Sequence, residues 1–128
     1  DALNALIATF GHDLPLRLRA WRQRLDEYAY QGWRVVLWGG GSKAVAFLTT
    51  LGVGKEIEYV VDINPHKAGT FLGGSGQQIV LPEFLRAYRP DIVVVMNPIY
   101  CAEVRAELEG MDLSPDLIAV DSLEPSHA

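Results

Sequence analysis

Residues 34–62 read RVVLWGGGSKAVAFLTTLGVGKEIEYVVD, and this stretch decides the fold. An apolar, β-branched run at positions 35–38 stops at three consecutive glycines. A helical pattern follows, with apolar residues at positions 44, 45, 47, 48 and 51, and a second apolar run at 57–61 ends in Asp62. The order strand, glycine loop, helix, strand and acid predicts a βαβ unit, in which a crossover helix joins two parallel strands.

The glycine loop has the spacing of a phosphate-binding turn. Gly39, Gly41 and Ala44 fit the pattern G-x-G-x-x-G/A, in which glycine lets the backbone tighten and a ligand come close. The helix that begins there directs unpaired N–H groups and its positive dipole end toward a phosphate or carboxylate. Asp62 ends the next strand, where an acid can meet a ribose hydroxyl. The alternative is a tight turn without a ligand, because α/β domains need such turns in any case.

The rest of the chain continues the alternation of strands and helices. Apolar periodicity predicts helices at residues 14–31, 43–51, 82–88 and 101–110, and strands at 33–38, 57–61, 78–81, 92–96 and 117–120. The run at 92–96 is apolar throughout, as in strands that are buried on both faces of a parallel sheet. We therefore expect an α/β, Rossmann-like three-layer domain with a parallel sheet of four to five strands and helices on both faces.

Three segments are expected along the chain. Residues 1–32 form an N-terminal helical segment that packs on the domain or links it to an upstream domain, residues 33–122 form the Rossmann-like domain, and residues 123–128 form a tail. The helix at 14–31 places apolar residues at positions 18, 21, 25 and 28 on one stripe, with the arginines at 17, 19, 22 and 24 on the opposite side. We favour a solvated face for these arginines over a grip on an anion or a partner.

Three polar clusters follow predicted strand ends, at residues 39–43, 62–67 and 97–100. They should converge, because ligands of open α/β sheets bind at the carboxyl ends of the strands. The loop at 62–76 is long for a connection, and long ordered loops in compact domains are usually functional. Lys43 and Lys67 would suit a pyrophosphate. The candidate substrate-binding residues are Gly39, Gly41, Ser42, Lys43, Asp62, Asn64, His66, Lys67, Asn97 and Tyr100.

Some of these residues also have a purely structural explanation. His66 could pair with a phosphate or act as a base near neutral pH, or it could simply be exposed in its loop. Asp62 could hold a ribose, or it could cap the turn through Asn64. Asn97 and Tyr100 could contact a base or a sugar, whereas Asn97 before a proline is equally a helix cap.

Composition limits the classes of function. The chain has 128 residues, of which 49% are hydrophobic and 21% charged, as expected for one compact domain but small for an entire cofactor enzyme. A net charge of -5 argues against a nucleic-acid surface. Apolar runs are far shorter than the roughly 20 residues of a membrane span, and without a signal segment the expected location is cytoplasmic. With one cysteine, Cys101, no disulfide and no metal site is expected.

No catalytic constellation is evident, so catalytic residues are left unassigned. The chain lacks a G-x-S-x-G elbow, metal-ligand spacing and a paired-carboxylate arrangement. Its histidines, at positions 12, 66 and 127, are far apart in sequence. A binding domain is therefore the safer inference.

Two further motifs carry a resemblance to a known family. Residues 59–69 read YVVDINPHKAG and residues 90–100 read PDIVVVMNPIY. With the glycine loop G-x-G-x-K, the segment D-x-N-P-x-K-x-G makes residues 33–120 resemble the C-terminal domain of three-part S-adenosylmethionine-dependent C-methyltransferases. This family is best known from enzymes that methylate deoxysugar nucleotides.

The resemblance implies a Rossmann-like domain that follows a zinc-binding domain and a methyl-donor-binding domain in the same polypeptide. The full-length enzyme would use S-adenosylmethionine, bound outside this chain. This chain would bind a nucleotide-sugar-like or other anionic substrate with the candidate residues above and present it to the methyl-donor domain. By itself the chain, which begins at Asp1, is expected to be inactive, and a homodimer is a further expectation.

The chain departs from the family's pattern at several positions. Leu37 stands where a methyl-donor loop usually has an acid before its glycines, so S-adenosylmethionine is not assigned to this loop. Gly40 stands where the family often has alanine, and residues 73–75 read GGS where a proline-glycine-threonine run is usual. The zinc-binding cysteines are absent from this chain.

Two other functions remain open. The chain could be a stand-alone NAD(P)-binding or other dinucleotide-binding Rossmann module, with Gly39, Gly41 and Ala44 at the pyrophosphate and Asp62 at the ribose. It could also be an interaction domain without a ligand, in which the helix at 14–31 packs on a neighbouring protein.

Overall fold

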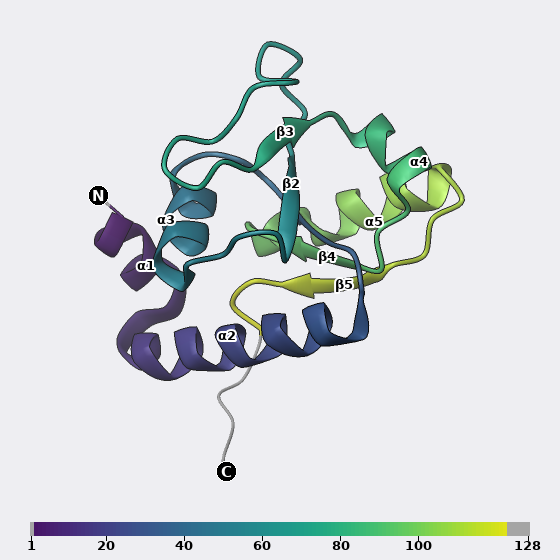
Figure 1. Cartoon of the computed structure of the whole chain (residues 1–128). Coiled ribbons are helices and arrows are strands. Elements are labelled where there is room, and N and C mark those ends of the chain that lie inside the picture. Colours follow the sequence, from purple (N-terminus) through teal and green to yellow (C-terminus); the bar gives the residue numbers. More distant parts are fainter. Residues whose placement is uncertain (1, 123–128) are drawn as a thin grey trace.

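The structure is a computed structural model that describes residues 2–122, without the side chains of residues 2 and 12. A parallel sheet lies between helices on both of its faces (Figure 1). The predicted tail at 123–128, which includes His127, lies outside the described residues. The elements are α1 (Ala2–Phe10), η1 (Gly11–Asp13), α2 (Leu14–Gln31), β1 (Val35–Trp38), α3 (Ser42–Leu51), β2 (Ile57–Val61), β3 (Gln78–Val80), η2 (Pro82–Phe84), α4 (Leu85–Tyr88), β4 (Ile92–Val95), η3 (Pro98–Tyr100), α5 (Cys101–Gly110) and β5 (Asp116–Ala119).

The five strands are parallel and lie in the order β3-β2-β1-β4-β5. The chain builds the sheet outward from β1 to one side and then returns to build the other side from β4. Strands β1 and β4 are buried along their whole length, as expected for apolar strands that are covered on both faces. The predicted α/β, Rossmann-like three-layer fold is therefore confirmed.

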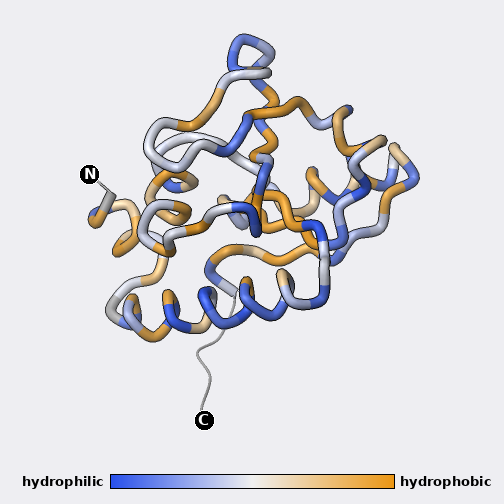
Figure 2. The backbone as a smooth tube through the Cα atoms, in the orientation of Figure 1, coloured by the Kyte–Doolittle hydropathy of each residue, from blue (hydrophilic) through white to orange (hydrophobic). Residues whose placement is uncertain are grey.

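Alternate residues of the strands supply two separate cores. On one face, Leu37 and Val94 pack with residues of α1, α2 and α3, including Phe47. On the other face, Val36 and Val95 pack with residues of α4 and α5. In Figure 2 the residues of the central strands are mostly hydrophobic, whereas hydrophobic and hydrophilic residues alternate along α2. The helices therefore cover the sheet by the amphipathic stripes that the sequence predicts.

Helix α2 is fastened to the sheet by Trp21, whose side chain is completely buried. The indole Nε1 donates a hydrogen bond of 2.8 Å to the carbonyl of Val120, which directly follows β5. The ring also makes an edge-on contact with Phe47 of α3, with ring centroids 5.3 Å apart. One residue thus joins α2, α3 and the end of the sheet.

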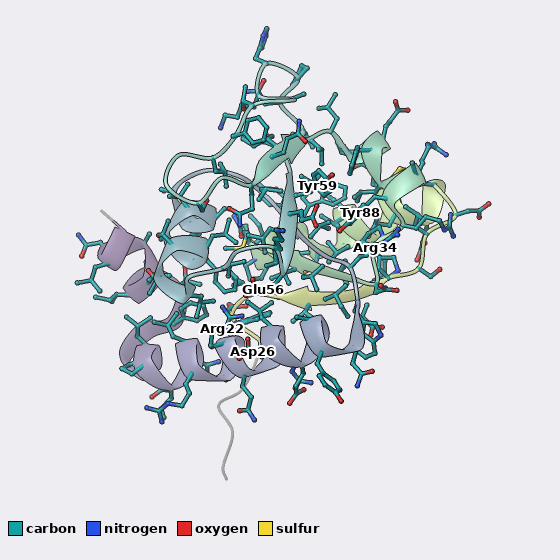
Figure 3. The ribbon with its side chains drawn as sticks, in the orientation of Figure 1. Arg22, Asp26, Arg34, Glu56, Tyr59 and Tyr88 are labelled. Atoms are coloured by element: carbon teal, nitrogen blue, oxygen red, sulfur yellow. The ribbon has the colours of Figure 1, made fainter. Side chains whose placement is uncertain are left out.

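The arginine prediction is wrong for Arg22. Its guanidinium donates to the carbonyl of Leu51 at the end of α3, and it pairs with Glu56 before β2 and with Asp26 on its own helix (Figure 3). Periodicity placed Arg22 outside the apolar stripe, but the long side chain reaches over the edge of the helix interface to these acceptors. Arg22 therefore ties α2 to the α3–β2 connection.

Two predicted boundaries also shift for a local reason. The first strand begins at Val35 rather than at Trp33, because Gly32 adopts a left-handed conformation that ends α2. The amide of Trp33 then donates back to the carbonyl of Tyr28, so residue 33 belongs to the helix cap. The helix predicted at 82–88 begins as a 3-10 turn at Pro82.

Within residues 2–122, no helix has the length and apolar character needed to cross a bilayer.

An aromatic cluster holds α4 against β2. Tyr59 of β2 lies 4.6 Å from Phe84 and 5.0 Å from Tyr88, measured between ring centroids. The guanidinium of Arg34 lies 5.1 Å from the centroid of the Tyr88 ring (Figure 3). Burial raises the pKa of the Tyr88 hydroxyl, and nearby Glu58 raises it further. These contacts account for the position of the short helix α4.

The Arg22–Glu56 pair predicts an acid-dependent contribution to stability. Burial alone would raise the pKa of Glu56, but hydrogen bonds from its own amide, from Arg22 and from the amide of Gly54 outweigh burial and lower it. A carboxyl whose pKa is lower in the folded state stabilises the fold above its unfolded pKa and loses this contribution as the pH falls through the folded value. Glu56→Gln should therefore show a smaller loss of Tm between pH 6 and about pH 3 than the parent protein, measured by circular dichroism.

Glu58→Gln is the matched control, because Glu58 is exposed two residues further along the chain. Its Tm should fall with decreasing pH as steeply as the Tm of the parent protein does. If the Tm of Glu56→Gln also fell as steeply with decreasing pH as that of the parent protein, the assigned role of Glu56 would be contradicted.

Candidate functional site

A cavity of about 610 Å³ lies at the carboxyl edge of the sheet. It is lined by residues that end or directly follow β1, β2 and β4, together with one side of α5. The order of the strands reverses between β1 and β4, and ligands of open α/β sheets bind at such a switch point. Its size also falls in the usual range for small-molecule sites. The lining residues are Trp38, Gly39, Gly40, Gly41, Ser42, Lys43, Val61, Asp62, Ile63, Val95, Met96, Asn97, Tyr100, Glu103, Val104 and Glu107.

The glycine loop forms the floor of this cavity. Gly39 has a φ of 111° and its amide donates to the carbonyl of Val61, so the loop is joined to β2 at its first residue. Gly41, with a φ of 97°, is the N-cap residue of α3 and supplies no side-chain cap. The first amides of α3 are therefore not capped by the side chain of the residue before them, as in helix N-termini that bind anions.

Asp62 lies against this loop. Its side chain is 15% exposed, and Oδ1 accepts a hydrogen bond of 2.9 Å from the amide of Asn64. An added Cβ at Gly40 would lie only 2.7 Å from Asp62 Oδ2, so the carboxylate occupies the space that a larger residue at position 40 would need. Lys67 Nζ lies 3.7 Å from the same oxygen. The structure thus confirms that Asp62 caps the turn through Asn64, and it also places Asp62 in the cavity lining.

The opposite wall comes from the segment after β4 and from α5. Asn97 Oδ1 accepts from the amide of Ile99 at 3.3 Å, which confirms its capping role. Asn97 and Tyr100 also line the cavity, and about half of the Tyr100 surface is exposed. Glu103 and Glu107, one helical turn apart on α5, complete this wall.

The charge of the lining is uneven. One lysine, Lys43, stands against the three acids Asp62, Glu103 and Glu107. Lys43 belongs to the first turn of α3, where the helix dipole adds to its positive charge. The cavity therefore has one end that suits an anion, whereas its α5 wall repels anions and accepts hydrogen bonds from donors.

The structure brings seven of the ten predicted site residues into this lining: Gly39, Gly41, Ser42, Lys43, Asp62, Asn97 and Tyr100. Asn64, His66 and Lys67 lie outside the lining, in the turn that follows Asp62. There Asn64 Oδ1 accepts from the amide of His66, and His66 is exposed. Among the side chains that the structure describes, which do not include that of His12, no three histidine, cysteine or acidic groups lie closely enough together to hold a metal ion.

Sequence reasoning missed several lining residues. The apolar ones, such as Val95 and Met96, belong to strand ends whose orientation is set only by the complete sheet. The α5 acids were missed as well, although Glu103 and Glu107 have the i, i+4 spacing that puts two side chains on one helix face. That spacing, on a helix that starts at a predicted strand end, was the signal that could have revealed them.

The chain matches a known protein family. The family described as C-methyltransferase C-terminal domain matches residues 5–114. A search of curated proteins finds no match to this chain. The family match begins within α1, includes α2 and the strands β1 to β4, and ends between α5 and β5.

The contact between Gly40 and Asp62 can be tested by substitution. Gly40→Ala should move the Asp62 carboxylate, because a flexible side chain yields more easily than the backbone. The free energy of unfolding should change by less than about 1 kcal/mol, since the carboxylate can turn away. The amide resonance of Asn64, which donates to Asp62 Oδ1, should shift in a ¹H–¹⁵N NMR spectrum.

Gly73→Ala is the matched control, because nothing lies within 4 Å of an added Cβ there. It should leave the Asn64 resonance in place. An unchanged Asn64 resonance in Gly40→Ala would show that the carboxylate does not occupy the assigned position.

Proposed function

The chain belongs to the family of C-methyltransferase C-terminal domains, and from this premise we propose that it is the substrate-side domain of the enzyme. In this role it binds a nucleotide-sugar-like or other anionic substrate. It then presents the acceptor atom to a separate methyl-donor domain, which membership in this family implies as a partner.

The observation that carries the proposal is the cavity at the switch point of the sheet. Its anion-favouring end combines the N-terminus of α3, which has no side-chain cap, with Lys43. Its other surfaces are the apolar residues of three strand ends and the donor-accepting side chains of Asp62, Glu103 and Glu107. A ligand with a phosphate group and several hydroxyl groups matches this distribution.

The methyl donor is assigned to the partner domain. Its family suggests that the enzyme uses S-adenosylmethionine, which supplies an electrophilic methyl group when bound. A methyl-donor loop usually has an acid before its glycines, whereas Leu37 and Trp38 stand there and are apolar and buried. This difference supports binding of the donor outside this chain. The task of this chain is therefore binding and orientation.

Residues 1–32 are proposed to be part of the domain rather than a linker. Trp21 and Leu25 are completely buried in the core beneath α3, and Arg22 bonds to the α3–β2 connection. An upstream domain would then approach an already packed helical layer.

A second candidate function is a dinucleotide-binding module. The position of Asp62 beside the glycine loop favours it, because an acid at this point accepts the ribose hydroxyls of NAD. The two proposed functions predict different ligands, so one titration with both kinds of ligand distinguishes them.

Binding should be measured by amide chemical-shift titration of the ¹⁵N-labelled chain with uridine diphosphate, thymidine diphosphate, NAD and S-adenosylmethionine. We expect a nucleoside diphosphate to shift the resonances of residues 39–43. Lys43→Gln should weaken this binding roughly three- to tenfold, because one charge-assisted contact to phosphate is lost. Lys55→Gln is the matched control, since Lys55 is exposed and lies outside the cavity lining, and it should bind like the parent chain.

Each other result has a defined meaning. Binding of NAD alone would favour the dinucleotide module, and binding of S-adenosylmethionine alone would place the donor in this chain. Absence of binding by all four ligands would contradict the proposed substrate site.

A further inference from the structure

The two edges of the sheet differ in what covers them. The outer side of β3 is covered by the segment before it, because the amide of Gly69 donates to the carbonyl of Ile79 and the amide of Ile79 donates to the carbonyl of Thr70. Strand β5 is the last strand on the other side (Figure 1), and among the described residues only β4 pairs with it. An open edge of this kind can pair with another strand through its free amides and carbonyls.

The pairing with β4 determines which main-chain groups of β5 are directed outward. The amides of Asp116 and Val120 both donate to carbonyls of β4. Alternate residues of a strand bond to the same neighbour, so the amides and carbonyls of Leu117 and Ala119 are directed away from the sheet. Pro115 is directed outward as well, but it offers only a carbonyl because proline has no N–H.

One of the outward carbonyls already has partners. The carbonyl of Ala119 accepts from the amide of Ser122 at 3.0 Å and from its hydroxyl at 2.8 Å, in the turn that ends β5. The outer side of β5 therefore offers two donors and two acceptors. The donors are the amides of Leu117 and Ala119, and the acceptors are the carbonyls of Pro115 and Leu117.

These four groups are complementary to the same four groups of a second copy. In an antiparallel ladder, residues directly opposite each other exchange two hydrogen bonds. If Leu117 lies opposite Leu117 of the second copy, each amide meets the other's carbonyl. Ala119 then lies opposite Pro115 of the second copy, and its amide meets the proline carbonyl. The bond that this register lacks joins the N–H that proline does not have to the Ala119 carbonyl that Ser122 already occupies.

The surroundings of the edge leave room for a second strand and carry complementary charges. A groove of about 510 Å³ lies beside residues 115–118, between Arg24 of α2 and Arg105 of α5. It holds these two exposed arginines and one acid, Asp116. Antiparallel pairing places the start of one strand beside the end of the other, so Asp121, which is exposed just after β5, approaches the arginines of the second copy. The symmetry repeats this attraction at both ends of the paired strands.

We propose that the outer edge of β5 binds a second copy of this chain, and that antiparallel pairing about Leu117 joins the two five-stranded sheets into one. The carboxyl edges of the two sheets then face in opposite directions, so each cavity stays open to its ligand. The proposal goes beyond the proposed function and does not depend on it. It gives the expected homodimer a defined interface.

The experiment combines the mass of the chain in solution with amide hydrogen exchange. Sedimentation equilibrium of the parent chain should show a monomer and a dimer in exchange, with a micromolar dissociation constant, since a short strand pair makes a small interface. Raising the concentration above that constant should slow exchange of the Leu117 and Ala119 amides at least roughly tenfold, because these amides are bonded only in the dimer.

Two variants test the charges and the main-chain bonds separately. Asp121→Lys should raise the dissociation constant at least about tenfold, because it brings a cation to Arg24 and Arg105 of the second copy. Glu83→Lys is the matched control, since it makes the same change on an exposed residue after β3, at the opposite edge of the sheet, and it should dimerise like the parent. Ala119→Pro removes an outward amide, which an edge strand tolerates, and it should weaken the dimer by a similar factor.

The other outcomes would overturn the proposal. A mass of one chain at millimolar concentration would exclude the dimer. A dimer in which the Leu117 and Ala119 amides exchange as fast as in dilute solution would place the interface elsewhere. Equal dissociation constants for the parent and Asp121→Lys would remove the assigned contact, and this variant decides the matter if circular dichroism shows that Ala119→Pro does not fold.

Discussion

Strand β1 lies between β2 and β4, and its four residues are buried on both faces. This central position constrains the chain at its carboxyl end, because the backbone must leave a covered sheet within a few residues and start α3. Gly39 allows this sharp turn because it adopts a positive φ, and its amide donates a hydrogen bond to the carbonyl of Val61. Gly41 also has a positive φ and is the N-cap residue of α3. The cavity lies where the three strands β1, β2 and β4 end and where α3 starts directly at the turn.

The same turn determines the electrostatics of the site. Gly40 has no side chain, and Asp62 fills the resulting space with a carboxylate. The charge stays in place because the Asn64 amide holds one oxygen and the strand that precedes Asp62 is fixed by pairing with β1. Because Gly40 has no side chain, the Asp62 carboxylate can lie against the loop and give this part of the cavity a negative charge. Lys67 approaches from the loop and offsets part of the negative charge, although it lies outside the lining.

Much of the fold could be predicted because its signals are local. One continuous stretch of sequence contains the buried run of β1, the glycines after it and Asp62, which follows β2. A parallel βαβ unit brings these parts together in a known way. The role of Arg22 could not be predicted, because its partners Leu51 and Glu56 are near it only after α2 has packed on α3. Periodicity describes which side of a helix faces a core, but not which long polar side chains reach a neighbouring element.

The site shows the same limit. Residues that follow strand ends were found by their position, whereas Glu103 and Glu107 reach the cavity only because α5 packs against the sheet through Val104 and Leu108. Conversely, Asn64, His66 and Lys67 follow a strand end and yet lie outside the cavity lining, because two successive turn hydrogen bonds lead the chain away from the cavity after Ile63. Position after a strand therefore selects candidates, and the local turn decides which of them reach the ligand.

Under the proposed function, the arrangement also gives a reason for a methyltransferase to bind its substrate with a separate domain. Methyl transfer to carbon depends on placing the acceptor atom in line with the donor, and binding energy from a distant part of the substrate can supply that placement. A nucleotide bound at a rigid sheet edge provides such a handle, because the cavity is built from three strand ends and two helices. In the proposed function this chain recognises the nucleotide end of the substrate, while the reacting end stays outside the cavity and within reach of the partner domain. Recognition and chemistry can in this way be placed on different surfaces of one enzyme.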